Sequence, residues 1–411
     1  MSDDVKCPLP WIHTSINTTG RVRSCCIAKE EIEDEGVPMD VINHSFSEII
    51  SSSSMRDIRG SMRLGKKHPN CATCWIDEKN GKTSKRMYET ELAGWLHGPV
   101  DYDVEPTVFK DIQLGVGNIC NLKCRTCSPF CSTKWIKEYK DSTGEASSTF
   151  NNLTKNKQTI GSKFWEDFEE WSKTVGRLEI MGGEPFFMKE FEMLIDRLIA
   201  NGSSENITIS MSSNATIYNG PLLEKILANF KFLGIQFSID GFGTAHFDYL
   251  RHGDSWKNVN DNLKKFYNLH KAHESFMMGM TFTMSQINMY YIREMHQFVE
   301  EFTKDSAKHF KIFNNIVHYP SYYSSNTIPE GLKEEYLDKI QNPTKYGLPE
   351  WDAEKYSTEI EPLVNHVKSK SKESDWVSFV KETNRADAYR GESFSKAFPE
   401  LWKLFEPHWI S

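Results

Sequence analysis

The chain has 411 residues, enough for one large domain with an appendage or for two or three domains. Its formal net charge of −8 gives no overall attraction to nucleic acid. The N-terminus lacks the basic and apolar regions of a signal peptide, and no apolar run approaches the ~20 residues of a membrane span. We therefore expect a cytoplasmic protein. In that compartment its nine cysteines are expected to serve metal or redox chemistry.

Residues 1–105 are expected to form a first domain, and they contain five of the nine cysteines. The segment 11–25 predicts a hairpin of two short strands around Thr18 to Gly20. The segment 45–65 predicts one helix, with Ser45 or Ser47 near its N-cap and Gly65 beyond its end. We therefore expect a small hairpin-and-helix module that carries a cluster of thiols.

Residues 106–320 alternate short apolar runs with amphipathic segments, which is typical of a parallel α/β sheet. Six strands are expected, at 111–116, 177–183, 207–213, 234–240, 276–284 and 309–317. Helices are expected at 187–202, 220–230, 256–273 and 290–304. Six βα units are fewer than the eight of a full TIM barrel, so we predict an open, partial (β/α)6 barrel with its functional residues at the C-terminal ends of the strands. Residues 321–411 are expected to form a helical C-terminal extension that covers one edge of this barrel.

Three cysteines follow the first strand of the predicted barrel. Cys120, Cys124 and Cys127 have the spacing C-x3-C-x2-C. Three thiolates can hold three irons of a [4Fe–4S] cluster and leave the fourth iron open to another ligand. Two alternatives remain open from spacing alone: a zinc site completed by Cys131, and a set of unrelated buried thiols.

The second strand ends in the sequence MGGEPFF, which contains Gly182, Gly183, Glu184 and Pro185. Two glycines permit a close approach of backbone, and a carboxylate pairs with an ammonium group. The sequence CNLKCRTC resembles the CxxxCxxC signature of radical S-adenosylmethionine (SAM) enzymes, and MGGEPFF resembles their GGEP motif. The resemblance implies that these four residues receive the amino group of SAM. It also implies that SAM chelates the open iron and is cleaved reductively, so that the resulting 5'-deoxyadenosyl radical abstracts hydrogen from a substrate.

The resemblance suggests further SAM contacts at the ends of the later strands. The candidates are Ser213 and Asn214 after the third strand, Ser238 and Asp240 after the fourth, Ile287 and Asn288 near the adenine, and Arg251 for the SAM carboxylate. An ordinary loop hydrogen bond is the alternative for each polar residue. The segment 318–325 ends the sixth strand and either lines the substrate cavity or packs at the barrel rim.

The N-terminal domain contains a second set of thiols, Cys7, Cys25, Cys71 and Cys74. Four thiols can close a complete cluster, and structural zinc is the alternative. The pattern CPLPW, G-x4-C and CxxC resembles the twitch module, a shortened relative of the SPASM domain that holds one auxiliary [4Fe–4S] cluster, although here it precedes the barrel. Cys26 adjoins Cys25 and competes with it as the ligand, whereas we expect Cys131 to be a free buried thiol.

These observations predict a radical SAM enzyme of oxidoreductase or modifying type with one auxiliary cluster. Its expected cofactors are two [4Fe–4S] clusters and SAM, and its expected partners are an unidentified small molecule or peptide and an electron donor such as flavodoxin or ferredoxin. No residue is singled out as catalytic, and neither membrane nor nucleic acid is expected as a partner. The alternative is a non-catalytic iron–sulfur or zinc-binding protein.

Overall fold

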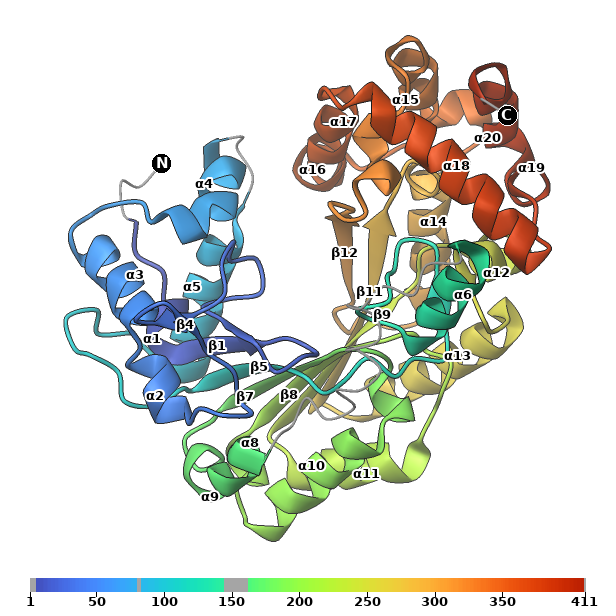
Figure 1. Ribbon diagram of the computed structural model, residues 1–411. Coiled ribbons are helices and arrows are strands. Elements are labelled where there is room, and N and C mark those ends of the chain that lie inside the picture. Colours follow the sequence, from blue (N-terminus) through green and yellow to red (C-terminus); the bar gives the residue numbers. More distant parts are fainter. Residues whose placement is uncertain (1–4, 80–82, 144–161, 410–411) are drawn as a thin grey trace. The chain divides into compact units, whose positions relative to one another are not determined.

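Eight strands form one mostly parallel sheet with the order β12-β11-β9-β8-β7-β5-β1-β2 in the computed structural model, which describes residues 5–79, 83–143 and 162–409 (Figure 1). The strands are β1 His13–Ile16, β2 Val22–Arg23, β5 Asp111–Gly115, β7 Arg177–Met181, β8 Thr208–Ser213, β9 Phe232–Ser238, β11 Phe276–Met284 and β12 Lys311–Ile316. The predicted α/β class is confirmed, and each of the six expected strands is present.

The chain divides into two compact units. The first comprises Met1–Ile119, Ser148–Ser212 and Asn219–Gly234, and the second comprises Cys120–Ser147, Ser213–Tyr218 and Ile235–Ser411. Strand β9 begins in the first unit and ends in the second. The three domains expected from the sequence remain a prediction. The absence of a signal peptide was expected from the N-terminal sequence, and residues 1–4 of that sequence lie outside the described residues.

The N-terminal part of the first unit contains the predicted hairpin. Strands β1 and β2 pair antiparallel, with Ser15 opposite Arg23, and β1 also pairs in parallel with β5. The single helix expected at 45–65 was wrong, because the structure has two helices, α2 (Phe46–Ile50) and α3 (Ser53–Arg63). Ser52 accepts a hydrogen bond from the N–H of Met55 and so begins a new helix where one continuous helix was expected. Other helices of this unit are α1 Leu9–Ile12, α4 Ala72–Lys79, α5 Lys85–His97, α8 Ser162–Glu166 and α9 Phe168–Trp171.

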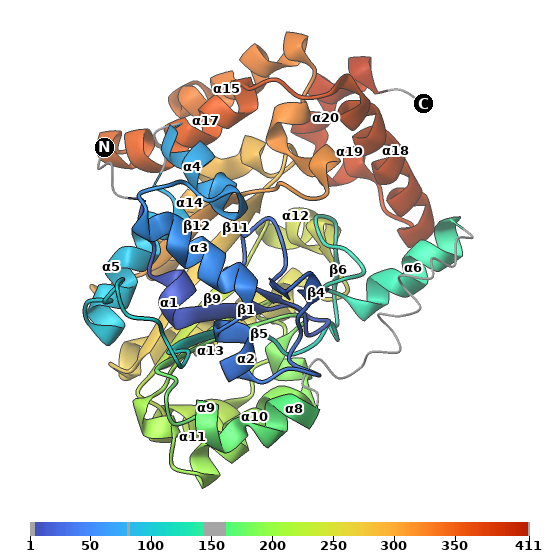
Figure 2. The same ribbon diagram turned by 60° about the vertical axis from the view of Figure 1, so that its left-hand side comes forward.

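The strands of the first unit present an apolar face and a polar face. Since successive strand residues point to opposite faces, Ile112, Leu178 and Ile209 share the apolar face, and all three are buried. Helices α10 (Lys189–Ala200) and α11 (Gly220–Asn229) lie side by side along these strands in Figures 1 and 2 and bury stripes of Leu, Ile and Phe. The polar face carries two rows of residues in register, His13, Asp111, Arg177 and Thr208 in one and Ser15, Gln113, Glu179 and Ser210 in the other.

The second unit contains the C-terminal end of β9, strands β11 and β12 and the helices of the C-terminal extension. Strands β11 and β12 pair in parallel, and the short strands β6 (Lys123–Cys124) and β10 (Arg251–His252) pair antiparallel. Its helices are α6 Thr133–Thr143, α12 Gly243–Leu250, α13 Trp256–Ala272, α14 Ile292–Thr303, α15 Lys333–Gln341, α16 Ala353–Lys355, α17 Glu361–Lys368, α18 Glu373–Arg390, α19 Phe394–Ala397 and α20 Pro399–Phe405. The C-terminal extension is therefore helical, as predicted. Among the described residues, no helix combines the length and apolar character needed to cross a bilayer.

Candidate functional site

The loop that carries Cys120, Cys124 and Cys127 lies in the second unit and is held by hydrogen bonds to its backbone. The N–H of Leu122 donates to Cys120 Sγ at 3.4 Å, and the N–H of Cys127 donates to the carbonyl of Cys124 at 3.0 Å. Trp135 Nε1 donates to the same carbonyl of Cys124 at 2.9 Å. All three cysteines are half-buried as residues.

Arg251 and Asp240 place opposite charges beside this loop. Strand β10 sets Arg251 opposite Cys124 of β6, and Arg251 Nη1 donates to Asp240 Oδ2 at 2.6 Å. Burial opposes the charge of Arg251, but the nearby Cys124 and Asp240 raise its pKa above the ordinary value. Burial likewise raises the pKa of the Cys124 thiol, and the charge of Arg251 opposes that rise. Arg251 Nε is buried and has no hydrogen-bond partner among the described residues, so this side retains a donor for an anionic group.

The loop after β8 contacts the first cysteine of the motif. Asn214 Nδ2 lies 3.8 Å from Cys120 Sγ and donates to Asn121 Oδ1 at 2.9 Å. Asn214 Oδ1 accepts the N–H and the hydroxyl of Thr216, at 3.0 and 2.6 Å. The neighbouring Ser213 is buried and its hydroxyl accepts the N–H of Ala215 at 3.2 Å. The structure thus brings the predicted Asn214 next to a predicted cluster ligand within the second unit.

The turn after β11 is organised by Asn288. Its Nδ2 donates to the carbonyls of Asp240 and Thr283 at 2.9 and 3.0 Å, and its Oδ1 accepts the N–H of Ser285 at 2.7 Å. Ile287 is fully buried and Ser238 is half-buried. The side chain of Asn288 is engaged in holding the loop, and the SAM contacts expected for these residues remain predictions.

The GGEP turn lies in the first unit and packs on the backbone that precedes Cys120. The N–H groups of Gly183 and Glu184 donate to the carbonyls of Gly117 and Ile119 at 2.9 and 3.0 Å. A Cβ at Gly182 would lie 2.2 Å from the Gly117 oxygen, and a Cβ at Gly183 would lie 2.0 Å from the Ile119 oxygen. Only glycine permits this approach. Glu184 is fully buried, and its Oε1 accepts the N–H of Phe186 at 3.3 Å.

Four cysteines of the first unit line one small pocket. Cys7 precedes α1, Cys25 follows β2, and the CxxC pair lies at the start of α4, so that Cys7, Cys25, Cys71 and Cys74 face the same space together with Lys85 and Arg86. Asn70 joins two of these segments, because its carbonyl accepts the N–H of Lys29 at 3.1 Å and its Oδ1 accepts the N–H of Glu30 at 2.6 Å. The structure brings together the four thiols that the sequence pattern grouped, and their role as cluster ligands stays a prediction.

Two basic side chains partly offset the effect of burial on the thiols of this pocket. Burial raises the pKa of all four thiols, to about 12 for Cys25 and to about 11 for Cys71. The charge of Lys85 opposes this rise at Cys25, and the charge of Arg86 opposes it at Cys71. Because iron and zinc bind the thiolate form, these two cations fit a metal group with an anionic ligand shell. Sequence reasoning missed both, although they directly follow Ser84, the N-cap of α5.

The remaining two cysteines lie apart from the four-thiol pocket. Cys26 does not line it, and instead burial raises the pKa of its thiol while Lys85 and a hydrogen bond with Gln113 lower it. Cys131 is exposed, which corrects the expectation of a buried thiol. In the described ranges, no three His, Cys, Asp or Glu side chains are arranged to hold a single metal ion.

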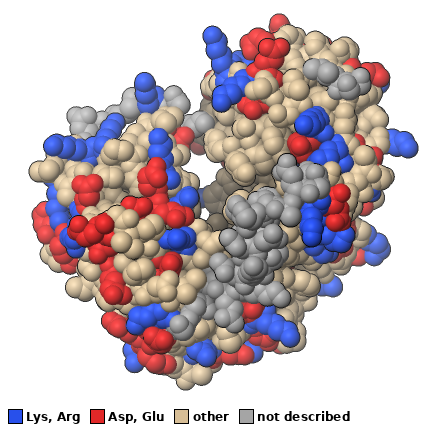
Figure 3. All heavy atoms as spheres, viewed as in Figure 1, with Lys and Arg blue, Asp and Glu red and all other residues tan. Residues whose placement is uncertain are grey.

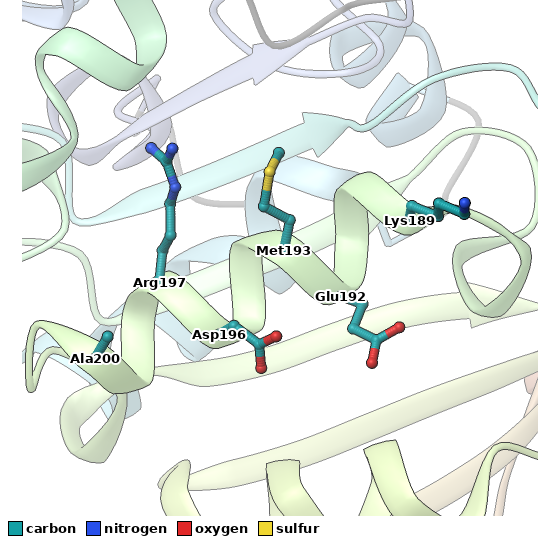
Figure 4. Close-up of a pocket in the computed structure, with 6 residues that line it drawn as sticks. All are labelled: Lys189, Glu192, Met193, Asp196, Arg197 and Ala200. Carbon is teal, nitrogen blue, oxygen red and sulfur yellow. The ribbon is translucent and has the colours of Figure 1, made fainter.

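Other surface features do not compete with these sites. The pocket of Figure 4 is lined by residues of α10 alone, including Lys189, Glu192 and Arg197, on the solvent side of the helix. Acidic and basic side chains are interspersed over the part of the first unit in view in Figure 3. The segment 318–325 belongs to the second unit and is partly buried there. Tyr323 is buried, and Ser324 Oγ lies 2.9 Å from His366 Nε2.

Residues 7–75 match the family model described as SPASM, an iron–sulfur cluster-binding domain. The N-terminal module is thus of the SPASM type. The match includes all four cysteines of the pocket and confirms the predicted resemblance of this module, so an iron–sulfur cluster is its cofactor class.

The similarity of this chain to solved structures is weaker than the family match of its N-terminal module. The structure of Streptococcus suis SuiB bound to precursor peptide SuiA matches at 14% identity and a TM-score of 0.32, over 70% of this chain and 63% of that chain. The structure of anSMEcpe with bound AdoMet and Cp18Cys peptide matches at 15% identity and a TM-score of 0.33, over 57% of this chain and 61% of that chain. The matched part is less than two thirds of the length of each of these two solved chains, and likenesses of this size carry no conclusion about activity. No curated protein matches the sequence significantly.

Proposed function

We propose that this protein is a radical SAM enzyme with an auxiliary [4Fe–4S] cluster that abstracts hydrogen from a small molecule or peptide. The proposal is carried by one arrangement: three half-buried cysteines beside the Arg251–Asp240 pair, on a loop that begins directly after the backbone against which the GGEP turn packs. The SPASM module supports it, because an iron–sulfur module already belongs to the same chain.

The residues present fit the two cofactors. In the proposal Cys120, Cys124 and Cys127 hold three irons of the first cluster, and Glu184 receives the SAM amino group. When bound, that cluster and SAM supply the reductive cleavage that generates a hydrogen-abstracting radical. Arg251 offers its free Nε to an anionic group and balances the thiolate charge at Cys124. The remaining SAM contacts are assigned, as proposals, to Ser213, Asn214, Ser238, Asp240, Ile287 and Asn288.

The auxiliary site has its own ligand set. We assign Cys7, Cys25, Cys71 and Cys74 to the four irons of a second cluster, one thiolate for each iron. Cys25 is preferred to Cys26 because only Cys25 lines the four-thiol pocket. Lys85 and Arg86 place positive charge beside the thiolates.

The experiment that tests the function is anaerobic reconstitution followed by reduction in the presence of SAM. Wild-type protein is expected to form 5'-deoxyadenosine, and Cys124→Ala is expected to form none while Cys131→Ala retains the activity. Protein that carries iron but forms no 5'-deoxyadenosine would support the alternative of a non-catalytic iron–sulfur protein. One zinc at the Cys120 loop in place of iron would support the zinc alternative.

The partners and location belong to the same proposal. A flavodoxin or ferredoxin is the expected electron donor, and the proposed substrate is either a small molecule or a peptide. The acidic chain offers no general attraction to nucleic acid. The cytoplasmic location, like the absence of a membrane partner, stays a prediction.

A further inference from the structure

Two basic side chains line the four-thiol pocket, and the protein holds each of them differently. Lys85 and Arg86 are the first two residues of α5, and both face the space that the four cysteines share. The apolar residues that line the same pocket are Leu9, Ile27 and Met62. Charges interact more strongly where apolar groups displace water. A cation at this pocket therefore acts strongly on whatever the thiols hold.

Arg86 is engaged by the protein itself. Its Nε and Nη2 donate to the two carboxylate oxygens of Glu78 at 3.0 and 2.9 Å, and its Nη1 donates to the carbonyl of Lys6 at 2.9 Å. Its guanidinium carbon also lies 5.1 Å from the centre of the Trp75 ring. The forked pair with Glu78 sets a carboxylate directly against the guanidinium. Arg86 thus joins helix α4 to the segment that precedes Cys7.

Lys85 stands instead at one end of a chain of ion pairs within the first unit. Its Nζ lies 2.8 Å from Glu89 Oε1, and Glu89 Oε2 lies 2.8 Å from Arg177 Nη2. Arg177 Nη2 also lies 3.0 Å from Asp111 Oδ2, and Asp111 Oδ1 lies 2.6 Å from His97 Nε2. The carboxylate of Glu89 is therefore shared between two cations, Lys85 and Arg177.

The charge of Lys85 persists although the side chain is only 20% exposed. Burial opposes the charge, but Cys26, Glu89 and Glu179 raise the pKa of Lys85 above its ordinary value. Lys85 is therefore a fixed cation at the pocket. Of the two basic side chains there, it is the one whose counter-ion also serves Arg177.

We propose that Lys85 raises the reduction potential of the auxiliary cluster, and that Glu89 holds its ammonium group at the four-thiol pocket for this purpose. The role rests on the proposed assignment of the four thiols as cluster ligands. Reduction adds one electron, and therefore one negative charge, to the cluster. A neighbouring cation stabilises that reduced form, so the cluster accepts an electron more readily.

The test is a redox titration of anaerobically reconstituted, full-length protein, with dithionite as the reductant and electron paramagnetic resonance as the readout. The signal that persists in Cys124→Ala, which lacks a ligand of the core cluster, belongs to the auxiliary cluster. Lys85→Met should lower the potential of this signal, so that the ratio of reduced to oxidised cluster at a given potential falls about tenfold. A tenfold change corresponds to about 59 mV for one electron. Lys85→Arg keeps the charge and should stay near the wild-type potential.

Lys189→Met is the matched control, because it removes the same charge from an exposed position on α10 that does not line the four-thiol pocket (Figure 4). It should leave the potential of the auxiliary cluster unchanged. Glu89→Gln tests the opposite direction, since it removes the counter-charge of Lys85 and should raise the potential.

An unchanged potential in Lys85→Met that carries its full iron content would give Lys85 a structural role only and overturn the proposal. If Lys85→Met does not hold its auxiliary cluster, Glu89→Gln decides. A potential of Glu89→Gln at or below the wild-type value, or loss of the cluster from both variants, would overturn the proposal, as would zinc in place of the auxiliary irons. The titration requires neither SAM nor substrate, so absence of 5'-deoxyadenosine from the wild-type protein would count against the proposed function alone.

Discussion

Arg125, between the second and third cysteines of the core motif, forms a buried ion pair with Asp387 of helix α18, with Nη2 2.5 Å from Oδ1. The same nitrogen lies 2.5 Å from Glu392, and the guanidinium carbon lies 3.7 Å from the centre of the Tyr249 ring. The C-terminal extension therefore holds the cysteine loop from one side. Its expected role was only to cover an edge of the barrel, and this contact gives it a specific one.

A second group of ion pairs joins the cysteine loop to helix α18. Glu138 of α6 is fully buried, and its carboxylate lies 2.8 Å from Lys123 Nζ and 3.0 Å from Arg390 Nε. Lys123 directly precedes Cys124, and Arg390 ends α18. Two buried charge networks thus connect the residues on either side of Cys124 to the C-terminal part of the chain.

Arg125→Met should destabilise the protein by about 3 kcal/mol, because it leaves Asp387 and Glu392 without their buried counter-charge. The measurement is the free energy of unfolding in urea, with iron content determined on the same samples. Lys137→Met is the control, since Lys137 is 78% exposed in its ion pair with Asp141, and surface pairs contribute about 0–1 kcal/mol. Equal stability of Arg125→Met and wild type would show that the extension does not brace the loop.

Glu184→Gln should weaken SAM binding by about tenfold or more, because it removes one charged contact worth roughly 1.5–3 kcal/mol. Glutamine retains an oxygen that accepts the N–H of Phe186, so the turn itself should persist. Equilibrium dialysis against SAM measures the affinity, and iron analysis checks that the core cluster is still assembled. An unchanged affinity would make GGEP a structural turn only.

Gly183→Ala should disrupt the core site without removing any functional group. Its Cβ would lie 2.0 Å from the Ile119 oxygen, so the backbone before Cys120 must move. We expect loss of iron from the core cluster. We also expect the protein to be destabilised by about 1–3 kcal/mol or more, the range typical of overpacking. Gly60→Ala on α3 is the control, because nothing lies within 4 Å of the added Cβ and alanine favours a helix. Full iron content in Gly183→Ala would contradict the close packing of this turn.

The sequence predicted those features that depend on local pattern. The six strands carry alternating or continuous apolar runs, and the thiols of CxxC and CxxxCxxC are close in the chain, so both were found without the structure. The Arg125–Asp387 pair joins residues 262 positions apart, and no local pattern selects one arginine or one aspartate for it. The polar face around Glu179 depends on strand register: each strand alone shows only alternation, and the row emerges when four strands align.

Replacement of Cys71 and Cys74 by Ala should halve the iron content, from about eight to about four per chain, because each cluster of this type holds four irons. The core thiols belong to the second unit, so their cluster should remain. Cys26→Ala and Cys131→Ala are the controls and should keep about eight irons, since neither thiol lines the four-thiol pocket. About four irons with one zinc in the wild-type protein would identify the module as a zinc site, contrary to this assignment.

His296 of α14 should make the protein less stable in acid. It is fully buried, and burial lowers its pKa from 6.5 to about 3, with Lys355 adding to the effect. Below pH 6.5 the unfolded chain binds a proton at this residue that the folded chain does not bind until about pH 3. Stability is therefore full above pH 6.5 and falls as pH decreases, by about 1.4 kcal/mol per pH unit for one such histidine.

His296→Gln should remove this share of the pH dependence while keeping an amide that can bond with Asn314, the present partner of the imidazole. The measurement is the free energy of unfolding in urea at intervals between pH 6.5 and pH 4.5, followed by tryptophan fluorescence. The slope of the variant should be smaller than that of the wild type by about one proton, whatever the variant's absolute stability, because His13, His246 and His270 also have lowered pKa values and keep their own contributions. His408→Gln, at an exposed position, should leave the slope as it is. Identical slopes for wild type and His296→Gln would mean that the imidazole takes up its proton in the folded protein as readily as in the unfolded chain.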